Sequence, residues 1–269
     1  MNKTILAIHA HPDDVEILAA GTLAQLSAAG HRVVIVSMTP GDCGSRDCAP
    51  EDIAAIRRKE AAAAAQLIGA AYRCAELRDL AIFNDDASRR RVTEVLRAVR
   101  PDVVVTASPV DYMCDHEATS ALVRDACFGA PAPNYATSAE SPAPALSAVP
   151  HLYFMDPIGG VDRENRPVIA DFYVDIGPQF ETKRAMLAEH ASQREWLLAQ
   201  HGIDDYLLTI ERWTREVGHR AGVVFAEGFR HYRGHPYPQT PFLEDLLRQA
   251  IRPRAQPPRD SACPSRAAQ

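Results

Sequence analysis

Two short stretches place histidine beside acidic residues at spacings that suit metal binding and hydrolysis. They are "HPDDVE", at the end of an apolar run, and "SPVDYMCDHEA", about a hundred residues later. Together they offer these imidazoles and carboxylates: His11, Asp13, Asp14, Glu16, Asp111, Asp115 and His116. Two imidazoles and one carboxylate around an open position suit Zn²⁺ or a similar divalent ion and leave room for water.

The same aspartates have a simpler interpretation as helix caps. Asp13 or Asp14 precedes one predicted helix and Asp115 lies at the start of another, where a carboxylate can accept hydrogen bonds from free backbone N–H groups. Either stretch alone is compatible with capping. Two such stretches at neighbouring strand ends instead predict a shared functional site.

The elements that must position these residues alternate regularly over the first 130 residues. Short β-branched or apolar runs predict strands at 3–10, 31–39, 72–77 and 101–108, whereas helical periodicity predicts helices at 14–30, 50–70, 86–100 and 116–130. This alternation predicts an α/β fold with a Rossmann-like, doubly wound, mainly parallel sheet. With the first and fourth strands adjacent, the two polar stretches face each other where the strand order reverses.

The rest of the chain predicts a single domain with a C-terminal extension. Strands are expected at 151–155 and 169–177, one long helix at 181–202, another at 204–222, and a return to the core over 223–238. The segment 131–150 is rich in Pro, Ala and Ser and predicts a loop or lid. The predicted domain covers 1–250, and the proline-rich segment 251–269 is expected to be a disordered tail.

Composition excludes several classes of protein. The 269 residues carry a formal net charge of −6, and no basic stretch offers a phosphate-binding surface, so no nucleic-acid partner is expected. No run is apolar enough to span a membrane. The six cysteines are scattered without a CxxC pair, and no signal peptide is evident, which predicts reduced thiols and a cytoplasmic location. Pairing or metal binding by Cys43 and Cys48 stays open, and so does homo-oligomerisation.

Several motifs of other enzyme classes are missing. The first strand is not followed by a dinucleotide-binding G-x-G-x-x-G, and the chain contains neither a P-loop nor a G-x-S-x-G nucleophile turn. "PGDCGS" is glycine-rich but follows the second strand, where a substrate loop is expected.

Together the motifs resemble the PIG-L/LmbE family of zinc-dependent N-deacetylases. The resemblance is carried by "AHPDDVE", "TPGDCGS", "IRRKEAAAAAQLIGA", "DYMCDHEATS" and "KRAMLAEHASQ" and covers roughly residues 4–195. It implies a hydrolase that removes an acyl group, usually acetyl, from an N-acetylglucosamine-type sugar or conjugate. Some members act instead on amides of thiol conjugates.

The resemblance also implies a role for each matched residue. His11, Asp14 and His116 would hold Zn²⁺, and Asp13 would be the general base. Arg57 would contact the substrate, and Asp115 would orient a metal ligand or cap its helix. Bound zinc can lower the pKa of water from 15.7 to about 7, which suits amide hydrolysis near neutral pH.

The chain departs from the family at Met113. Many members have a histidine there, two positions before the aspartate, whereas methionine neither donates a hydrogen bond nor carries charge. Tyr112, His190, His231 and His235 are the candidates to stabilise the oxyanion in its place. Three hypotheses follow: an amino-sugar deacetylase, an amidase for a non-sugar N-acyl or thiol conjugate, and a metal-binding protein whose catalysis has lapsed.

Overall fold

The computed structural model describes residues 2–137, 139–201 and 206–253. Its strands are β1 (Thr4–His9), β2 (Arg32–Ser37), β3 (Ala71–Cys74), β4 (Val103–Thr106), β5 (His151–Met155), β6 (Phe172–Asp175), β7 (Ala226–His231) and β8 (Ile251–Arg252). Its α-helices are α1 (Asp14–Ala28), α2 (Pro50–Gln66), α3 (Asp86–Val99), α4 (Cys114–Gly129), α5 (Phe180–Ala188), α6 (Ala191–His201), α7 (Tyr206–Ala221) and α8 (Phe242–Leu246). Two short 3₁₀ turns, η1 (Ile158–Gly160) and η2 (Gly177–Gln179), complete the described elements.

All eight strands form one mixed sheet in the order β3-β2-β1-β4-β5-β7-β6-β8. The first five of these positions are parallel, and the pairs involving β7, β6 and β8 are antiparallel. β1 and β4 are neighbours, with Ile5 opposite Val103. The predicted α/β fold and the predicted adjacency of the first and fourth strands are confirmed.

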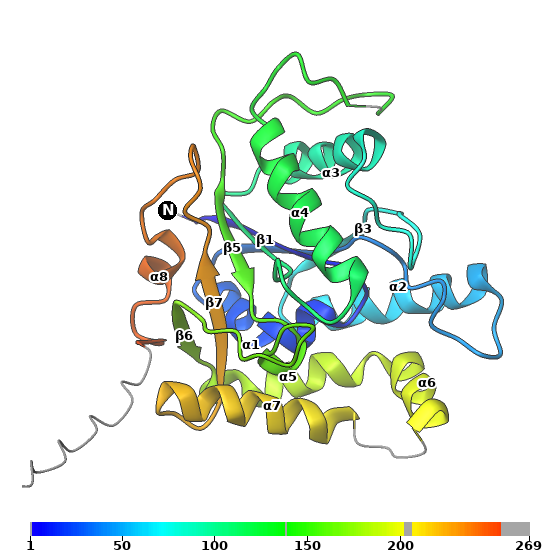
Figure 1. Cartoon of the computed structure of the whole chain (residues 1–269), viewed down its shortest axis with the longest axis vertical. Helices are drawn as coiled ribbons and strands as arrows, with labels where there is room; N and C mark the ends of the chain where they lie inside the picture. The colour runs from blue at the N-terminus through cyan, green and yellow to red at the C-terminus, as the bar shows by residue number, and fades with distance from the viewer. Residues whose placement is uncertain (1, 138, 202–205, 254–269) are drawn as a thin grey trace, which may run out of the picture.

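Helices cover both faces of the sheet, as Figure 1 shows. In β1, Ile5 and Ala7 belong to the core under α1, α2 and α5, while Leu6 and Ile8 belong to the core under α3 and α4. All four side chains are fully buried. A strand buried on both faces has no solvent side, so its sequence is continuously apolar rather than alternating. Its first polar residues come where it ends.

Two predicted boundaries in the C-terminal half are wrong. The helix predicted over 181–202 is two helices, α5 and α6, separated at Glu189 and His190. His190 is buried, with its Nε2 3.7 Å from Glu16 Oε1, so a polar contact with α1 accompanies the break. The predicted tail also begins too early, because Ile251 and Arg252 pair with β6. Its remainder from 254 lies outside the described residues.

A buried ion pair supports the middle of α1. Lys183 Nζ lies 2.7 Å from Glu227 Oε1 and donates to the Ile17 carbonyl at 2.6 Å. The Glu227 carboxylate accepts from the amides of Gly21 and Thr22 at 3.0 and 2.8 Å. α5 and β7 thus satisfy backbone groups just beyond the first turn of α1, which carries Asp14 and Glu16.

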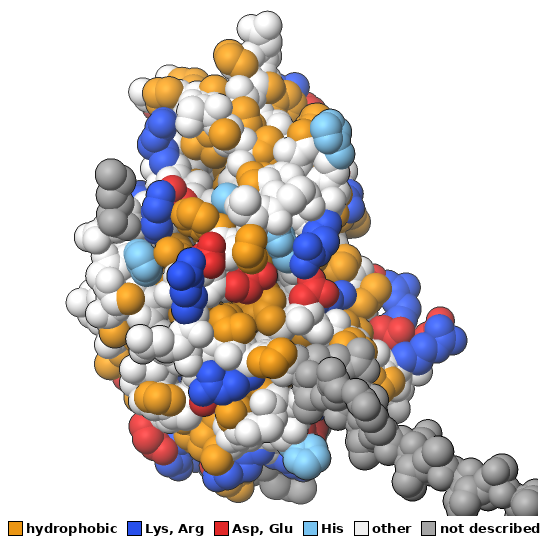
Figure 2. Space-filling view, turned by 90° about the vertical axis from the view of Figure 1, so that its left-hand side faces the viewer, with side chains coloured by type: hydrophobic (Ala, Val, Ile, Leu, Met, Phe, Trp, Pro, Cys, Tyr) orange, Lys and Arg blue, Asp and Glu red, His pale blue; other side chains and the backbone are white. Residues whose placement is uncertain are grey.

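The described surface is mixed in charge. On the face in Figure 2, basic and acidic side chains are interspersed with apolar ones. None of the described helices is long and apolar enough to cross a membrane. Cys43, Cys48, Cys74, Cys114 and Cys127 are free thiols.

Candidate active site

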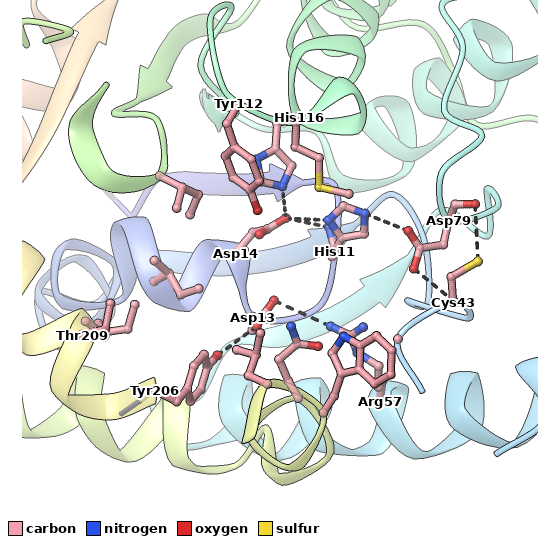
Figure 3. A pocket seen from close by; sticks show the side chains of 18 of the residues that line it. His11, Asp13, Asp14, Cys43, Arg57, Asp79, Tyr112, His116, Tyr206 and Thr209 are labelled. Atoms are coloured by element: carbon pink, nitrogen blue, oxygen red, sulfur yellow. Dashed lines mark hydrogen bonds and ion pairs between the residues drawn. The ribbon is translucent and has the colours of Figure 1, made fainter. Parts of the chain in front are cut away.

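A cavity of about 860 Å³ opens at the carboxyl ends of β1, β2 and β4, and Figure 3 shows its interior. Polar lining side chains come from the loops after β1, β3 and β4, from the first turns of α1 and α4, and from α2. A second group of lining side chains comes from α6 and α7, which lie near one another in Figure 1. The cavity therefore lies where ligands usually bind in α/β proteins. Helices from a distant part of the sequence complete its wall.

Asp14 is the common contact of three histidines. Its Oδ2 lies 2.7 Å from His9 Nδ1, 3.3 Å from His11 Nδ1 and 3.4 Å from His116 Nε2. The backbone N–H of His11 donates to the same oxygen at 2.8 Å, which fixes its position. The predicted ligands His11, Asp14 and His116 are thus brought together from two loops. We call these three residues, with Asp13, the metal end of the cavity.

The electrostatics of this cluster suit a cation. Burial alone would raise the pKa of Asp14, but the imidazoles of His116 and His9 hold it well below its usual range. Burial alone would lower the pKa of His11, yet hydrogen bonds to Asp115, Asp14 and Asp79 raise it well above its usual value. Carboxylates that favour a protonated imidazole favour a bound metal cation for the same reason.

Two further carboxylates hold the other side of the His11 ring. His11 Nε2 lies 3.0 Å from Asp79 Oδ1 and 3.3 Å from Asp115 Oδ2. Asp115 Oδ2 also accepts from the Leu80 amide at 2.7 Å. The N-cap of α4 is Met113, so Asp115 does not occupy the capping position. A carboxylate behind a ligand histidine fixes the ring orientation and tautomer.

Asp13 adopts a backbone conformation that the capping interpretation does not explain. It is the N-cap of α1, but its φ is +98° and its side chain caps no N–H group. A positive φ is uncommon for a residue other than glycine and is associated with functional sites. Its carboxylate instead accepts from Tyr206 Oη at 2.9 Å and lies 3.7 Å from Arg57 Nη2.

The pKa of the Asp13 carboxyl is shifted toward neutral pH. Burial raises its pKa to about 6, although Arg57 and the Tyr206 hydrogen bond act in the lowering direction. A general base works best when its pKa lies near the working pH.

Arg57 lines the cavity but is held by protein groups. Its guanidinium donates to the Pro12 carbonyl at 2.9 Å and to the Gly41 carbonyl at 3.4 Å. Gly41 has a φ of +72°, and a Cβ there would lie 2.4 Å from Arg57 Nη1, so both the turn and the close approach require glycine. The structure directs Arg57 toward Asp13 rather than into open space.

The second motif contributes His116, Tyr112 and Met113. His116 Nδ1 lies 3.0 Å from Asp111 Oδ1, which leaves Nε2 for the metal end. Tyr112 and Met113 both line the cavity, and the Tyr112 ring lies 5.6 Å from the His116 ring. His190, His231 and His235 are not among the described residues that line it.

Two three-residue groups of potential ligands lie within metal-binding reach. Their atoms fall within 4.8 Å of one another in His9, Asp14 and His116, and again in His11, Asp79 and Asp115. The His9 ring is fully buried, and its Nδ1 lies 2.7 Å from Asp14 Oδ2 and 2.9 Å from the Ala10 amide nitrogen. Since His11 lines the cavity and His9 does not, access favours His11 as the ligand.

The cavity residues that sequence reasoning missed include Asp79, Trp196, Tyr206 and Trp213. Asp79 lies in an irregular segment after β3, and in the sequence it is far from both polar motifs. Tyr206 reaches Asp13 across 193 positions of sequence, and the tryptophans lie on amphipathic helices that resemble ordinary core helices. The "KRAMLAEHASQ" motif, which spans the break between α5 and α6, was the one sequence feature that connected this region with the family resemblance.

Comparison with known proteins gives a consistent family and fold. Residues 6–127 match the family model described as PIG-L, GlcNAc-PI de-N-acetylase. Diacetylchitobiose deacetylase from Thermococcus kodakarensis is 27% identical over 248 residues, which cover 86% of this chain and 84% of that protein. 4-Oxalmesaconate hydratase from Pseudomonas putida is 27% identical over 199 residues, covering 71% of this chain and 74% of the hydratase.

Solved structures of similar proteins have the same fold. The N,N'-diacetylchitobiose deacetylase of Pyrococcus horikoshii superimposes with a TM-score of 0.72 at 28% identity and covers 91% of this chain and 89% of its own. The Pseudomonas putida hydratase superimposes with a TM-score of 0.71 at 22% identity, covering 88% of this chain and 99% of its own, and so shares the fold.

Proposed function

From the match of residues 6–127 to the PIG-L family model, we propose that the chain is a metal-dependent hydrolase acting on an N-acyl amine. It would remove the acyl group, acetyl in the simplest case, from an amino-sugar-containing small molecule. The observation that carries the proposal is the approach of His11 and His116 to one oxygen of Asp14, beside an Asp13 carboxylate that caps no helix. Similar proteins that deacetylate diacetylchitobiose or a glucosamine–inositol conjugate favour the amino-sugar class.

The donor set fits the expected metal. Two imidazole nitrogens and one carboxylate oxygen are available at a cavity wall, and His11 and His116 each have a carboxylate on the other ring nitrogen. Such three-residue sets are typical of catalytic zinc sites with an open position. A bound Zn²⁺ would supply Lewis acidity, which acidifies water and polarises a carbonyl.

The chain's own residues provide the proton transfers. Asp13, oriented by Tyr206 and Arg57, accepts the proton of the attacking water and returns it to the leaving amine. Tyr112, which lines the cavity beside His116, donates to the developing oxyanion in place of the imidazole that Met113 cannot supply. The apolar side chains around them limit competing water.

Replacing Asp13 by Asn tests the assignment of the base. We expect kcat for acetate release from N,N'-diacetylchitobiose or another N-acetyl amino sugar to fall by about 10² to 10⁴, with bound zinc retained. Asp86→Asn, an exposed carboxylate at the start of α3, is the matched control. An Asp13→Asn protein with full activity would overturn the assignment, and metal binding without turnover in the wild type would favour lapsed catalysis.

A second candidate is the addition of water to an activated carbon–carbon double bond. It is favoured by the similarity to a hydratase over 71% of the chain. The two reactions share Asp13 as the proton acceptor. Loss of the ultraviolet absorbance of a conjugated unsaturated dicarboxylate, without acetate release from any N-acetyl compound, would select hydration.

A further inference from the structure

Both tryptophans of the chain line the candidate active-site cavity. Trp196 lies on α6 and Trp213 on α7, and each is half-buried. Ile17, Leu197 and Ile210 line the cavity with them. We call these five residues the apolar wall. Trp213, Ile17 and Leu197 also pack partly against the buried cluster that contains Ile210. The part of each large indole that stays open at the cavity offers binding area.

Most polar groups at and beside the metal end already have protein partners, although Arg57 Nε has none. Arg57 donates to Pro12 and Gly41, Asp13 accepts from Tyr206, and Asp79 contacts His11 and the Cys43 amide. Near the apolar wall, Gln193 lines the cavity and its Oε1 lacks a partner. Hydroxyl groups pressed against aliphatic and indole surfaces would lose hydrogen bonds to water, at a free-energy cost. An apolar group would gain from the same contact.

The size of the cavity supports a larger ligand than an acetylated monosaccharide alone. Its volume of about 860 Å³ lies toward the upper end of the range of sites that bind drug-sized molecules. The reacting amide must lie at the metal end, which leaves the region between α6 and α7 for another part of the substrate.

We propose that the apolar wall binds an aryl or alkyl group of the substrate, so that the physiological substrate is an N-acyl amine with an apolar substituent. This inference rests on the proposed function and deepens it. The apolar group belongs either to the acyl chain or to the amine-bearing portion. Both share one chemistry, and the experiment below separates them.

The first test measures binding without turnover. Phenyl β-D-glucoside and methyl β-D-glucoside contain no amide, and their binding can be followed by intrinsic fluorescence because both tryptophans line the cavity. We expect the phenyl compound to bind at least tenfold more tightly, and Trp213→Leu to remove most of that difference. Leu208→Ala, an exposed position on the same helix, is the control and should retain it. Equal binding of the two glucosides by the wild type would overturn the proposal.

The second test measures turnover in two matched pairs. N-hexanoyl- against N-acetylglucosamine varies the acyl side, and the phenyl against the methyl glycoside of N-acetylglucosamine varies the amine side. We expect kcat/KM to rise at least tenfold in one pair, which identifies the side that faces the apolar wall. Trp213→Leu should reduce that ratio and Leu208→Ala should not. No rise in either pair would contradict the proposal.

The outcomes separate this inference from the proposed function. Tighter binding of phenyl glucoside without hydrolysis of any amide would contradict the hydrolase and retain the apolar subsite. Rapid deacetylation of N-acetylglucosamine, with no preference for apolar substituents, would retain the hydrolase and contradict the subsite.

Discussion

The metal end and the apolar wall of the same cavity are built by different parts of the chain and stabilised by different forces. The metal end is a network of charged contacts on loops that follow parallel strands β1 and β4, and the apolar wall is mainly a surface of two C-terminal helices. Charged groups that must approach within 3–4 Å tolerate few substitutions. An apolar surface can change its side chains and still bind. Our proposals assign the reaction chemistry to the metal end and substrate choice to the apolar wall.

The largest expected effect concerns the buried ion pair that supports α1, the helix that carries both Asp14 of the metal end and Ile17 of the apolar wall. Lys183 and Glu227 are almost completely buried, and removing one charge of such a pair costs about 3–5 kcal/mol. Lys183→Met should lower the free energy of unfolding by that amount in a urea titration. It should also weaken metal binding, because Lys183 holds the carbonyl of Ile17, next to the turn that carries Asp14.

The control for this prediction is an exposed ion pair. Arg58 and Glu76 pair at the surface, with about 40% of each side chain exposed, and Arg58→Met should cost less than about 1 kcal/mol. If Lys183→Met and Arg58→Met lowered the free energy of unfolding by similar amounts, the buried ion pair would not be the support of the metal end that we infer.

A smaller effect is expected at Tyr206, which belongs to α7 but contacts Asp13. Tyr206→Phe removes a hydrogen bond that lowers the pKa of the Asp13 carboxyl, so that pKa should rise. The base acts when ionised, and the acidic limb of the kcat/KM profile should therefore move to higher pH. Loss of one charge-assisted hydrogen bond should raise that pKa by about one unit. We therefore expect kcat/KM to fall about tenfold on the acidic limb and about twofold at pH 7. An unshifted acidic limb would separate Tyr206 from the base.

The metal end could be predicted from sequence because its residues follow local rules. A buried strand with two covered faces ends abruptly in polar residues, and "HPDD" and "DYMCDH" mark two such ends. Adjacent parallel strands then bring His11, Asp14 and His116 together. The strand order from β3 to β4 followed from the same alternation of elements.

The apolar wall could not be predicted in this way. Trp196 and Trp213 lie on helices whose apolar periodicity is the same whether a side chain faces the core or a cavity. The break between α5 and α6 is accompanied by a tertiary contact of His190 with Glu16, whereas local helix propensity predicted one continuous helix. The Tyr206–Asp13 contact likewise depends on how α7 packs, which no local motif encodes.

Metal removal and return is the most direct test of the central claim. The purified protein would be treated with a chelator, then titrated with Zn²⁺ while bound metal and acetate release from an N-acetyl amino sugar are both measured. We expect one ion per chain, activity lost with the ion and regained in proportion to it, and neither metal binding nor activity in Asp14→Ala. A metal-free protein with full activity would contradict it.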